Sequence, residues 1–298
     1  VRDYNSNNKI KRIACGPNVD DYHWTREVMD KVKHHAQGIS LHYYTIPGDT
    51  WEHKGSATEF DTKEYYKTLA RAYRIEELIN NHIAVMNSVN PQQWVNLVVD
   101  EWGTWYDVEP GTNPGFLYQQ NTMRDAMVAA LTLNIFNKHS DRIMMANIAQ
   151  TVNVLQSMIL TDAQKMVLTP TYYVFKMFKE HQNNMLLGSF ITTDKIDSKE
   201  AKRFCPQLIE SASIDENDII YSTVVNIADK KSAKIKCQIA DRKVKNIKAY
   251  VLNGDIHDKN DFENTNAVEI KDFNDFRQLK DGFTATLPAC SVVKFVIE

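Results

Sequence analysis

Glu101 is the side chain in this sequence that is best placed for covalent chemistry. It follows the apolar, β-branched run Val95–Val99 and precedes the aromatic segment Trp102–Tyr106. Such a run predicts a buried strand, and polar side chains are expected where that strand leaves its sheet. A carboxylate beside aromatic rings at the carboxyl end of a barrel strand suits attack on a sugar. The segment alone leaves an equally good alternative, a strand-terminal Glu held in a salt bridge.

Two other predicted strands bring polar groups to the same rim, that is, the edge of the predicted sheet where the carboxyl ends of its strands meet. The run Gly38–Tyr44 places His42 and Tyr44 on one face near its end, because side chains alternate along a strand. Gln150 comes just after another predicted strand, Ile143–Ile148. Taken singly, His42 and Tyr44 are equally well explained as hydrogen-bonded core residues. The coincidence of polar groups at three successive strand ends favours a binding site.

The same alternation separates two acidic neighbours on the predicted strand. Asp100 and Glu101 are adjacent in the sequence, so their side chains are expected to point to opposite faces. We therefore expect only one of these two carboxylates to face the interior of a barrel.

The order of the elements predicts two domains. Up to residue 185, strand-like runs alternate with helical ones, such as Thr62–Ser88 and Tyr118–Lys138, which is typical of a parallel sheet. Beyond it, short alternating runs separated by Gly, Asn and Asp indicate an antiparallel β-sandwich. All five Trp and all ten Met lie at or before Met185. This change in composition places the domains at 1–185 and 186–298.

Composition excludes several classes of partner. The net charge of −3 argues against a surface for nucleic acid or for an anionic membrane. No run reaches the ~20 apolar residues that span a bilayer. The cysteines are widely spaced and are expected to be buried thiols, with no metal site implied: Cys15, Cys205, Cys237 and Cys290. Neither a metal nor an organic cofactor is expected.

Several segments together carry a resemblance to a known family. Ser40–Tyr44, Val99–Tyr106 and Ala146–Gln156 resemble, in order and separation, glycoside hydrolase family 51, the α-L-arabinofuranosidases. Asn260–Val268 and Leu287–Val293 resemble the tail of the same family. The resemblance implies an α/β plus all-β fold: the second half of a (β/α)8 TIM barrel, strands five to eight, followed by a C-terminal antiparallel β-sandwich.

The resemblance also implies roles for the residues at the rim. Glu101 matches the nucleophile of a retaining glycosidase, which forms a covalent glycosyl-enzyme intermediate. His42 and Tyr44 match a pair that orients the nucleophile and contacts the sugar. Gln150 matches a residue that hydrogen-bonds the substrate, and Trp105 matches an aromatic wall of the furanose pocket.

Two features depart from the family pattern. Gly103 stands where the family more usually has Asn, which is expected to alter loop packing. The family's acid/base is the Glu of an Asn-Glu pair, and no such pair precedes the predicted strand Arg12–Cys15. Asp49, Glu52 and Glu59 follow the next strand, but carboxylates in polar loops are usually only solvated.

The sequence therefore predicts the nucleophile-bearing portion of a retaining α-L-arabinofuranosidase, inactive by itself. The substrate expected is an arabinose-containing oligo- or polysaccharide such as arabinan or arabinoxylan. The partner expected is the missing N-terminal half of the barrel, and the family implies a homo-oligomer. Two alternatives stay open: a catalytically inactive carbohydrate-binding or assembly module, and another retaining barrel glycosidase such as a xylanase or glucanase.

Overall fold

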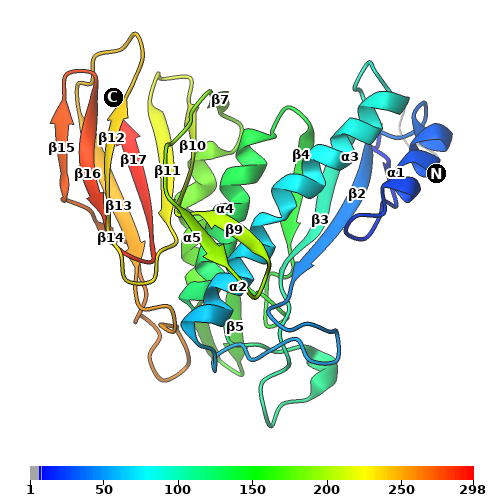
Figure 1. The fold of residues 1–298 in the computed structure, drawn as a ribbon, viewed down its shortest axis with the longest axis horizontal. Helices are drawn as coiled ribbons and strands as arrows, with labels where there is room; N and C mark the ends of the chain where they lie inside the picture. Colours follow the sequence, from blue (N-terminus) through cyan, green and yellow to red (C-terminus); the bar gives the residue numbers. More distant parts are fainter. Residues whose placement is uncertain (1–6, 8) are drawn as a thin grey trace.

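The first half of the chain is built on an open parallel sheet (Figure 1). The computed structural model describes residues 7 and 9–298. The strands lie in the order β1-β2-β3-β4, and every neighbouring pair is parallel. Their bounds are Ile13–Ala14, Gly38–Thr45, Asn96–Thr104 and Ile143–Ile148. The carboxyl ends of all four strands therefore meet at one rim of the sheet, as the sequence predicted.

Helices connect these strands and continue into the second half. Asp21, Asp61 and Thr122 cap three of them through side-chain oxygens that accept backbone N–H groups in the first turn. The helices are α1 (Tyr22–Val32), α2 (Thr62–Tyr73), α3 (Ile75–Val89), α4 (Met123–Lys138) and α5 (Pro170–Phe178), with the short 3-10 turns η1 (Pro114–Phe116) and η2 (Lys179–His181).

The expectation of one continuous helix over Thr62–Ser88 is wrong. The structure has two helices that meet at Arg74, whose N–H bonds the carbonyl of Arg71, three residues back, at 3.1 Å. The apolar periodicity runs on across the break, with Leu69 and Leu78 both fully buried. Periodicity alone therefore gave no sign of the interruption.

The second half is an antiparallel sandwich of two sheets (Figure 1). The six-stranded sheet has the order β14-β13-β17-β11-β10-β7, and the three-stranded sheet has the order β12-β16-β15. In chain order these strands are β7 (Met185–Leu187), β10 (Leu208–Ile214), β11 (Ile220–Asn226), β12 (Ala233–Gln238), β13 (Ile247–Asn253), β14 (Lys271–Asp272), β15 (Phe276–Leu279), β16 (Gly282–Leu287) and β17 (Ser291–Ile297). The predicted boundary between residues 185 and 186 falls inside β7, and a division there stays a proposal.

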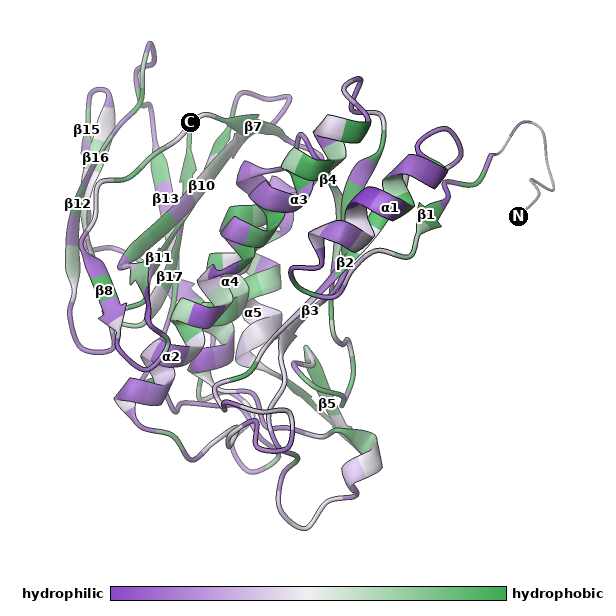
Figure 2. Cartoon of the chain, turned by 45° about the vertical axis from the view of Figure 1, so that its right-hand side comes forward, coloured by the Kyte–Doolittle hydropathy of each residue, from purple (hydrophilic) through white to green (hydrophobic). Residues whose placement is uncertain are grey.

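Two hairpins that the sequence did not reveal complete the fold. They pair β5 (Ile159–Asp162) with β6 (Lys165–Leu168), and β8 (Lys195–Ser198) with β9 (Arg203–Pro206). The first lies in the loop after β4, at the same end of the sheet as the rim. Figure 2 shows hydrophilic residues along much of β8, in keeping with its place on the surface.

Helix α4 joins the two halves of the molecule. Most of its residues are buried, because it contacts α2, α5 and β3 on one side and β10, β11 and β17 on the other. One apolar cluster consequently runs from the parallel sheet into the sandwich and includes Leu41, Val99, Leu131, Val225 and Val292. A second cluster fills the space between the two sandwich sheets. The rim therefore rests on a continuous packed core.

The prediction of four buried thiols is partly wrong. Cys205 and Cys290 are buried, and burial raises the pKa of the Cys290 thiol to about 12. Cys237 is half-buried, whereas Cys15 is exposed because it directly follows the edge strand β1. None of the helices described in residues 7 and 9–298 is long and apolar enough to cross a membrane.

Candidate active site

Glu101 lies within a strand rather than at its tip. Strand β3 continues to Thr104, so the expectation that the sheet ends at Glu101 is wrong by three residues. Trp102 and Thr104, which follow Glu101 on this strand, are buried, whereas the Glu101 side chain is 48% exposed. The carboxylate is thus fixed to a rigid strand and still open to a ligand.

An irregularity in β3 overturns the expectation for the two acidic neighbours. Ser40 pairs with Val98, but His42 pairs with Glu101, so β3 contributes one residue more than β2 between these pairs. A bulge of this kind breaks the strict alternation of side chains. His42 consequently meets both carboxylates: its Nε2 lies 3.1 Å from Asp100 Oδ1 and its Nδ1 lies 3.4 Å from Glu101 Oε2.

Tyr44 completes the group around Glu101. Its hydroxyl donates to Glu101 Oε2 at 3.0 Å, the same oxygen that His42 approaches. Burial, together with the negative charge of Glu101 and this hydrogen bond, raises the pKa of the Tyr44 hydroxyl well above its usual range. The other carboxylate oxygen, Oε1, makes no hydrogen bond to any residue that the structure describes. One oxygen of Glu101 is therefore held while the other is available.

An aromatic surface continues outward from Tyr44. The Trp105 ring meets the Tyr44 ring edge-on, with 4.9 Å between centroids. Trp51, on the loop after β2, meets Trp105 in the same way at 5.6 Å. Three aromatic side chains from two loops and a strand thus form a continuous wall beside the carboxylate.

Gln150 lies at the same rim but apart from this group. It follows β4, its peptide bond to Ala149 is cis, and its N–H donates to the Val154 carbonyl at 3.2 Å. Its side chain is exposed and makes no hydrogen bond within the described part of the chain. The structure therefore brings together Glu101, His42, Tyr44 and Trp105, whereas Gln150 stands on the neighbouring loop without a hydrogen bond to any of them within the described residues.

A buried polar network beneath the rim was not foreseen. Thr104 Oγ1 donates to Asp125 Oδ1 at 2.6 Å, and Thr104 N donates to Gln156 Oε1 at 2.8 Å. Gly103 has a φ of +137°, and a Cβ there would lie 3.1 Å from Gln156 Oε1. Glycine consequently lets Gln156 pack against the strand, and the expected effect of this departure on loop packing stays a prediction. Burial raises the pKa of the Asp125 carboxyl.

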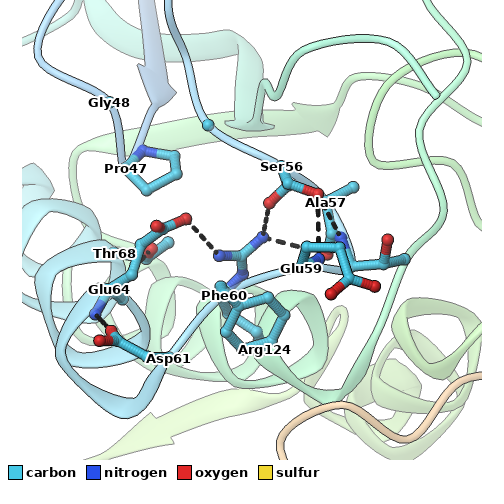
Figure 3. Close-up of polar contacts among 12 residues, drawn as sticks. Pro47, Gly48, Ser56, Ala57, Glu59, Phe60, Asp61, Glu64, Thr68 and Arg124 are labelled. Carbon is cyan, nitrogen blue, oxygen red and sulfur yellow. Dashed lines mark hydrogen bonds and ion pairs between the residues drawn. The ribbon is translucent and has the colours of Figure 1, made fainter. Parts of the chain in front are cut away.

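Arg124 holds the loop after β2 from below (Figure 3). This side chain is fully buried, and its guanidinium donates to the carbonyls of Ser56 and Ala57 at 2.8 and 3.1 Å. It also lies 3.3 Å from Glu64 Oε1 and stacks 3.8 Å from the centroid of the Phe60 ring. A single helix residue therefore fixes the start of α2 and the loop that precedes it.

The carboxylates of that loop do not resemble a general acid. Asp49 is bonded to Lys67 and Arg71 at 2.8 and 2.7 Å, and these cations lower the pKa of its carboxyl. The pKa of Glu52 is also lowered, chiefly by a bond to its own backbone N–H. A general acid needs a raised pKa to hold its proton near neutral pH. Glu59 is simply exposed.

No group of three or more His, Cys, Asp or Glu that could hold a metal ion occurs in the described residues. The chemistry that the rim can support is that of a positioned carboxylate. It lies beside a histidine, a tyrosine hydroxyl and an aromatic wall, a combination suited to a sugar.

Comparison with known proteins identifies the family. The profile described as the alpha-L-arabinofuranosidase C-terminal domain matches residues 100–291. The chain belongs to this family. An intracellular exo-alpha-L-arabinofuranosidase of Bacteroides ovatus is 41% identical over 299 residues, which cover 100% of this chain and 57% of that protein.

Solved arabinofuranosidase structures agree with this assignment. The GH51 arabinofuranosidase from Xanthomonas axonopodis pv. citri is 40% identical, with a TM-score of 0.95 over 99% of this chain and 60% of that one. The enzyme from Thermotoga maritima, solved as an arabinose complex, is 24% identical with a TM-score of 0.80 and supports the fold. The predicted fold class is confirmed: the parallel strands are the second half of the barrel, and the sandwich follows. The chain spans about 60% of these relatives.

Proposed function

We propose that the protein containing this chain is a retaining α-L-arabinofuranosidase, which releases terminal α-L-arabinofuranosyl units from arabinan- or arabinoxylan-type saccharides. The observation that carries the proposal is the arrangement of Glu101, whose Oε2 is held by Tyr44 while Oε1 makes no bond within the described part of the chain. A nucleophile needs this combination of fixed position and free lone pair. Membership of the arabinofuranosidase family supports the substrate class.

In the proposed first step, Glu101 Oε1 attacks the anomeric carbon of the arabinofuranosyl unit. A carbon–oxygen bond forms as the glycosidic bond breaks, and the leaving oxygen takes a proton from an acid. In the second step, water attacks the same carbon, gives its proton to that residue, and releases Glu101. Tyr44 and His42 keep the carboxylate oriented through both steps, because both lie against the oxygen that does not attack.

The proposed acid/base lies outside this chain. Retaining glycosidases keep their two carboxyl groups about 5–5.5 Å apart. Asp49, Glu52 and Glu59 are unsuited for the reasons given above. Asp100 is adjacent to Glu101 on the same strand, and its Oδ1 is buried and lies 3.1 Å from His42 Nε2. We therefore assign the acid/base to the strands that complete the barrel.

The proposed partner follows from the open sheet. Strands β1 and β4 are its two edges, and edge strands present unpaired backbone groups. Ile13 and Met145 on these edges are 39% exposed each. Four further strands would pair both edges, cover these side chains and bring in the acid/base. Trp105 and Gln150 would then contact the arabinose from two of the surrounding loops, and a homo-oligomer is the expected assembly.

Azide rescue tests the proposal in the full-length protein. Glu101→Ala should abolish hydrolysis of an aryl α-L-arabinofuranoside, and added azide should restore turnover by attacking the face that Glu101 leaves empty. The product would be the arabinofuranosyl azide of inverted configuration. Glu59→Ala, which removes an exposed carboxylate from the neighbouring loop, is the matched control and should behave as wild type.

Other outcomes would point to the alternatives. An azide product of retained configuration would make Glu101 the acid/base instead of the nucleophile. A wild-type protein that hydrolyses xylan or glucan oligosaccharides in preference to arabinosides would be a different barrel glycosidase. A full-length protein that binds arabino-oligosaccharides without cleaving them would be an inactive module.

A further inference from the structure

Trp51 is a large aromatic side chain that the fold leaves half exposed beside the candidate site. Its side chain lies on the loop between β2 and α2 and is 50% exposed. Its ring continues the wall that starts at the candidate nucleophile: Tyr44 bonds Glu101 at 3.0 Å, Trp105 meets Tyr44 at 4.9 Å, and Trp51 meets Trp105 at 5.6 Å. Trp51 is therefore the outermost member of a series that leads away from the carboxylate.

Two other tryptophans are exposed to a similar degree, and both have a clear structural role. Trp24 is 45% exposed and its Nε1 donates to the Cys15 carbonyl at 3.1 Å. Trp94 is 46% exposed and its Nε1 donates to the Lys33 carbonyl. The indole N–H of Trp51 makes no hydrogen bond in residues 7 and 9–298. Trp51 thus combines a half-exposed aromatic ring with an indole N–H that no described residue accepts.

The loop that carries Trp51 is held firmly. Arg71 donates to each of the three carbonyls of Ile46–Gly48. Gly48 N donates to the Lys54 carbonyl at 2.7 Å, and Lys54 Nζ donates back to the Trp51 carbonyl at 2.8 Å. The loop is a closed, internally bonded turn, so the backbone that carries the exposed ring is fixed before any ligand binds.

A second set of bonds fixes Trp51 relative to Trp105. Asp107 accepts hydrogen bonds from Lys54 N and Gly55 N at 3.2 and 3.1 Å, and Asp107 N donates to the Gly55 carbonyl at 2.9 Å. Asp107 stands two residues after Trp105 in the sequence. The loops that carry the two rings are therefore bonded to each other, which keeps the two aromatic faces in one arrangement.

We propose that Trp51 is a specificity-determining residue that binds the saccharide unit on the leaving-group side of the scissile bond. This inference rests on the proposed function, because Glu101 defines where the bond is cut. Sugar rings carry apolar C–H faces and hydroxyl groups, and a tryptophan that offers an aromatic face and a free N–H matches both. Tryptophans fixed in this way supply much binding energy for little loss of conformational freedom.

The test compares a substrate that reaches Trp51 with one that does not, in the full-length protein. For arabinotriose, Trp51→Ala should lower kcat/KM about tenfold, since the ligand would cover about half of a large aromatic side chain. For methyl α-L-arabinofuranoside, whose leaving group is methanol and is too small to reach Trp51, kcat/KM should change by no more than about twofold. Trp51→Phe should lose less of kcat/KM for arabinotriose than Trp51→Ala does, because Phe retains an aromatic face.

Trp94→Ala is the matched control. This side chain is exposed to a similar degree but lies before β3, at the opposite end of the sheet. Its loss should leave unchanged the ratio of kcat/KM for arabinotriose to kcat/KM for methyl α-L-arabinofuranoside. Equal losses on both substrates in Trp51→Ala, or no loss on either, would overturn the inference while leaving the proposed function intact. Wild-type protein that cleaves neither substrate would refute the proposed function, and the inference with it.

Discussion

Replacement of Arg124 by Met is predicted to destabilise the protein by about 3–5 kcal/mol, the range for breaking a buried ion pair, and toward its lower end because the Arg124 side chain is fully buried but that of Glu64 is 32% exposed. The change removes the guanidinium but keeps an unbranched apolar side chain about as long as the aliphatic stem of Arg124. It leaves Glu64 without its partner and the Ser56 and Ala57 carbonyls without their donor. Each buried acceptor left unpaired costs about 1–3 kcal/mol. Stacking on the rings of Phe60 and Tyr106 adds about 1–2 kcal/mol more.

These contributions share one side chain and are not additive. The Nε of Arg124 is also buried without a partner, which already reduces the benefit of the native arrangement. Both considerations favour the lower half of the range. The assay is urea denaturation of the full-length protein at pH 7. The free energy of unfolding is compared between the wild type and the variant, with the slope m against urea concentration expected to stay the same.

Arg203→Met is the matched control for this prediction. Arg203 also pairs with a glutamate, Glu77, at 2.7 Å, but the two side chains are 37% and 47% exposed. An exposed pair contributes about 0–1 kcal/mol. Adding Glu64→Gln to Arg124→Met should recover part of the loss, because it removes the unpaired charge. A loss in Arg124→Met no larger than that in Arg203→Met would refute the reasoning.

Two further predictions concern the rim and the sandwich. Tyr44→Phe should lower kcat/KM about tenfold, the lower end expected for a hydrogen bond to a charged group, because Glu101 is 48% exposed and water replaces part of the bond. Tyr43→Phe is the control: its hydroxyl bonds the Arg71 carbonyl on the other face, and equal losses would contradict the role of Tyr44. Burial lowers the pKa of His181 from 6.5 to about 4, so the unfolded chain binds the extra proton first as pH falls. This group should therefore lower the free energy of unfolding by about 3 kcal/mol between pH 6.5 and 4. The decrease should be smaller in His181→Asn. Plots of unfolding free energy against pH that run parallel for the wild type and His181→Asn would contradict this prediction.

Much of the architecture was predictable because periodicity reports burial directly. The strand predicted at Ile143–Ile148 is β4 without any change of bounds. The alternation of strands and helices, followed by short antiparallel runs, predicted the barrel half and the sandwich. The hairpin β5–β6 was missed because each strand is four residues long, too short for a periodic pattern to be distinguished from a loop.

The fine geometry of the site was less predictable. The bulge in β3 that brings Asp100 and Glu101 to the same histidine arises from pairing with β2, which one strand's sequence does not reveal. Arg124 resembles an ordinary surface residue of an amphipathic helix, yet α4 is buried on nearly all sides between the two halves of the molecule. The Thr122-x-x-Asp125 capping box was the available signal for the start of α4, which begins five residues after the predicted Tyr118.

Trapping of the covalent intermediate tests the central claim most directly. A 2-deoxy-2-fluoro arabinofuranosyl substrate with a good leaving group should react with the full-length protein and accumulate as an ester, because the fluorine slows the second step more than the first when the leaving group is good. Digestion and mass spectrometry should then find one added fluoropentosyl group, on the peptide that contains Glu101 and at that residue. A label on any other carboxylate, or release of product with no label at all, would contradict the assignment of Glu101 as the nucleophile.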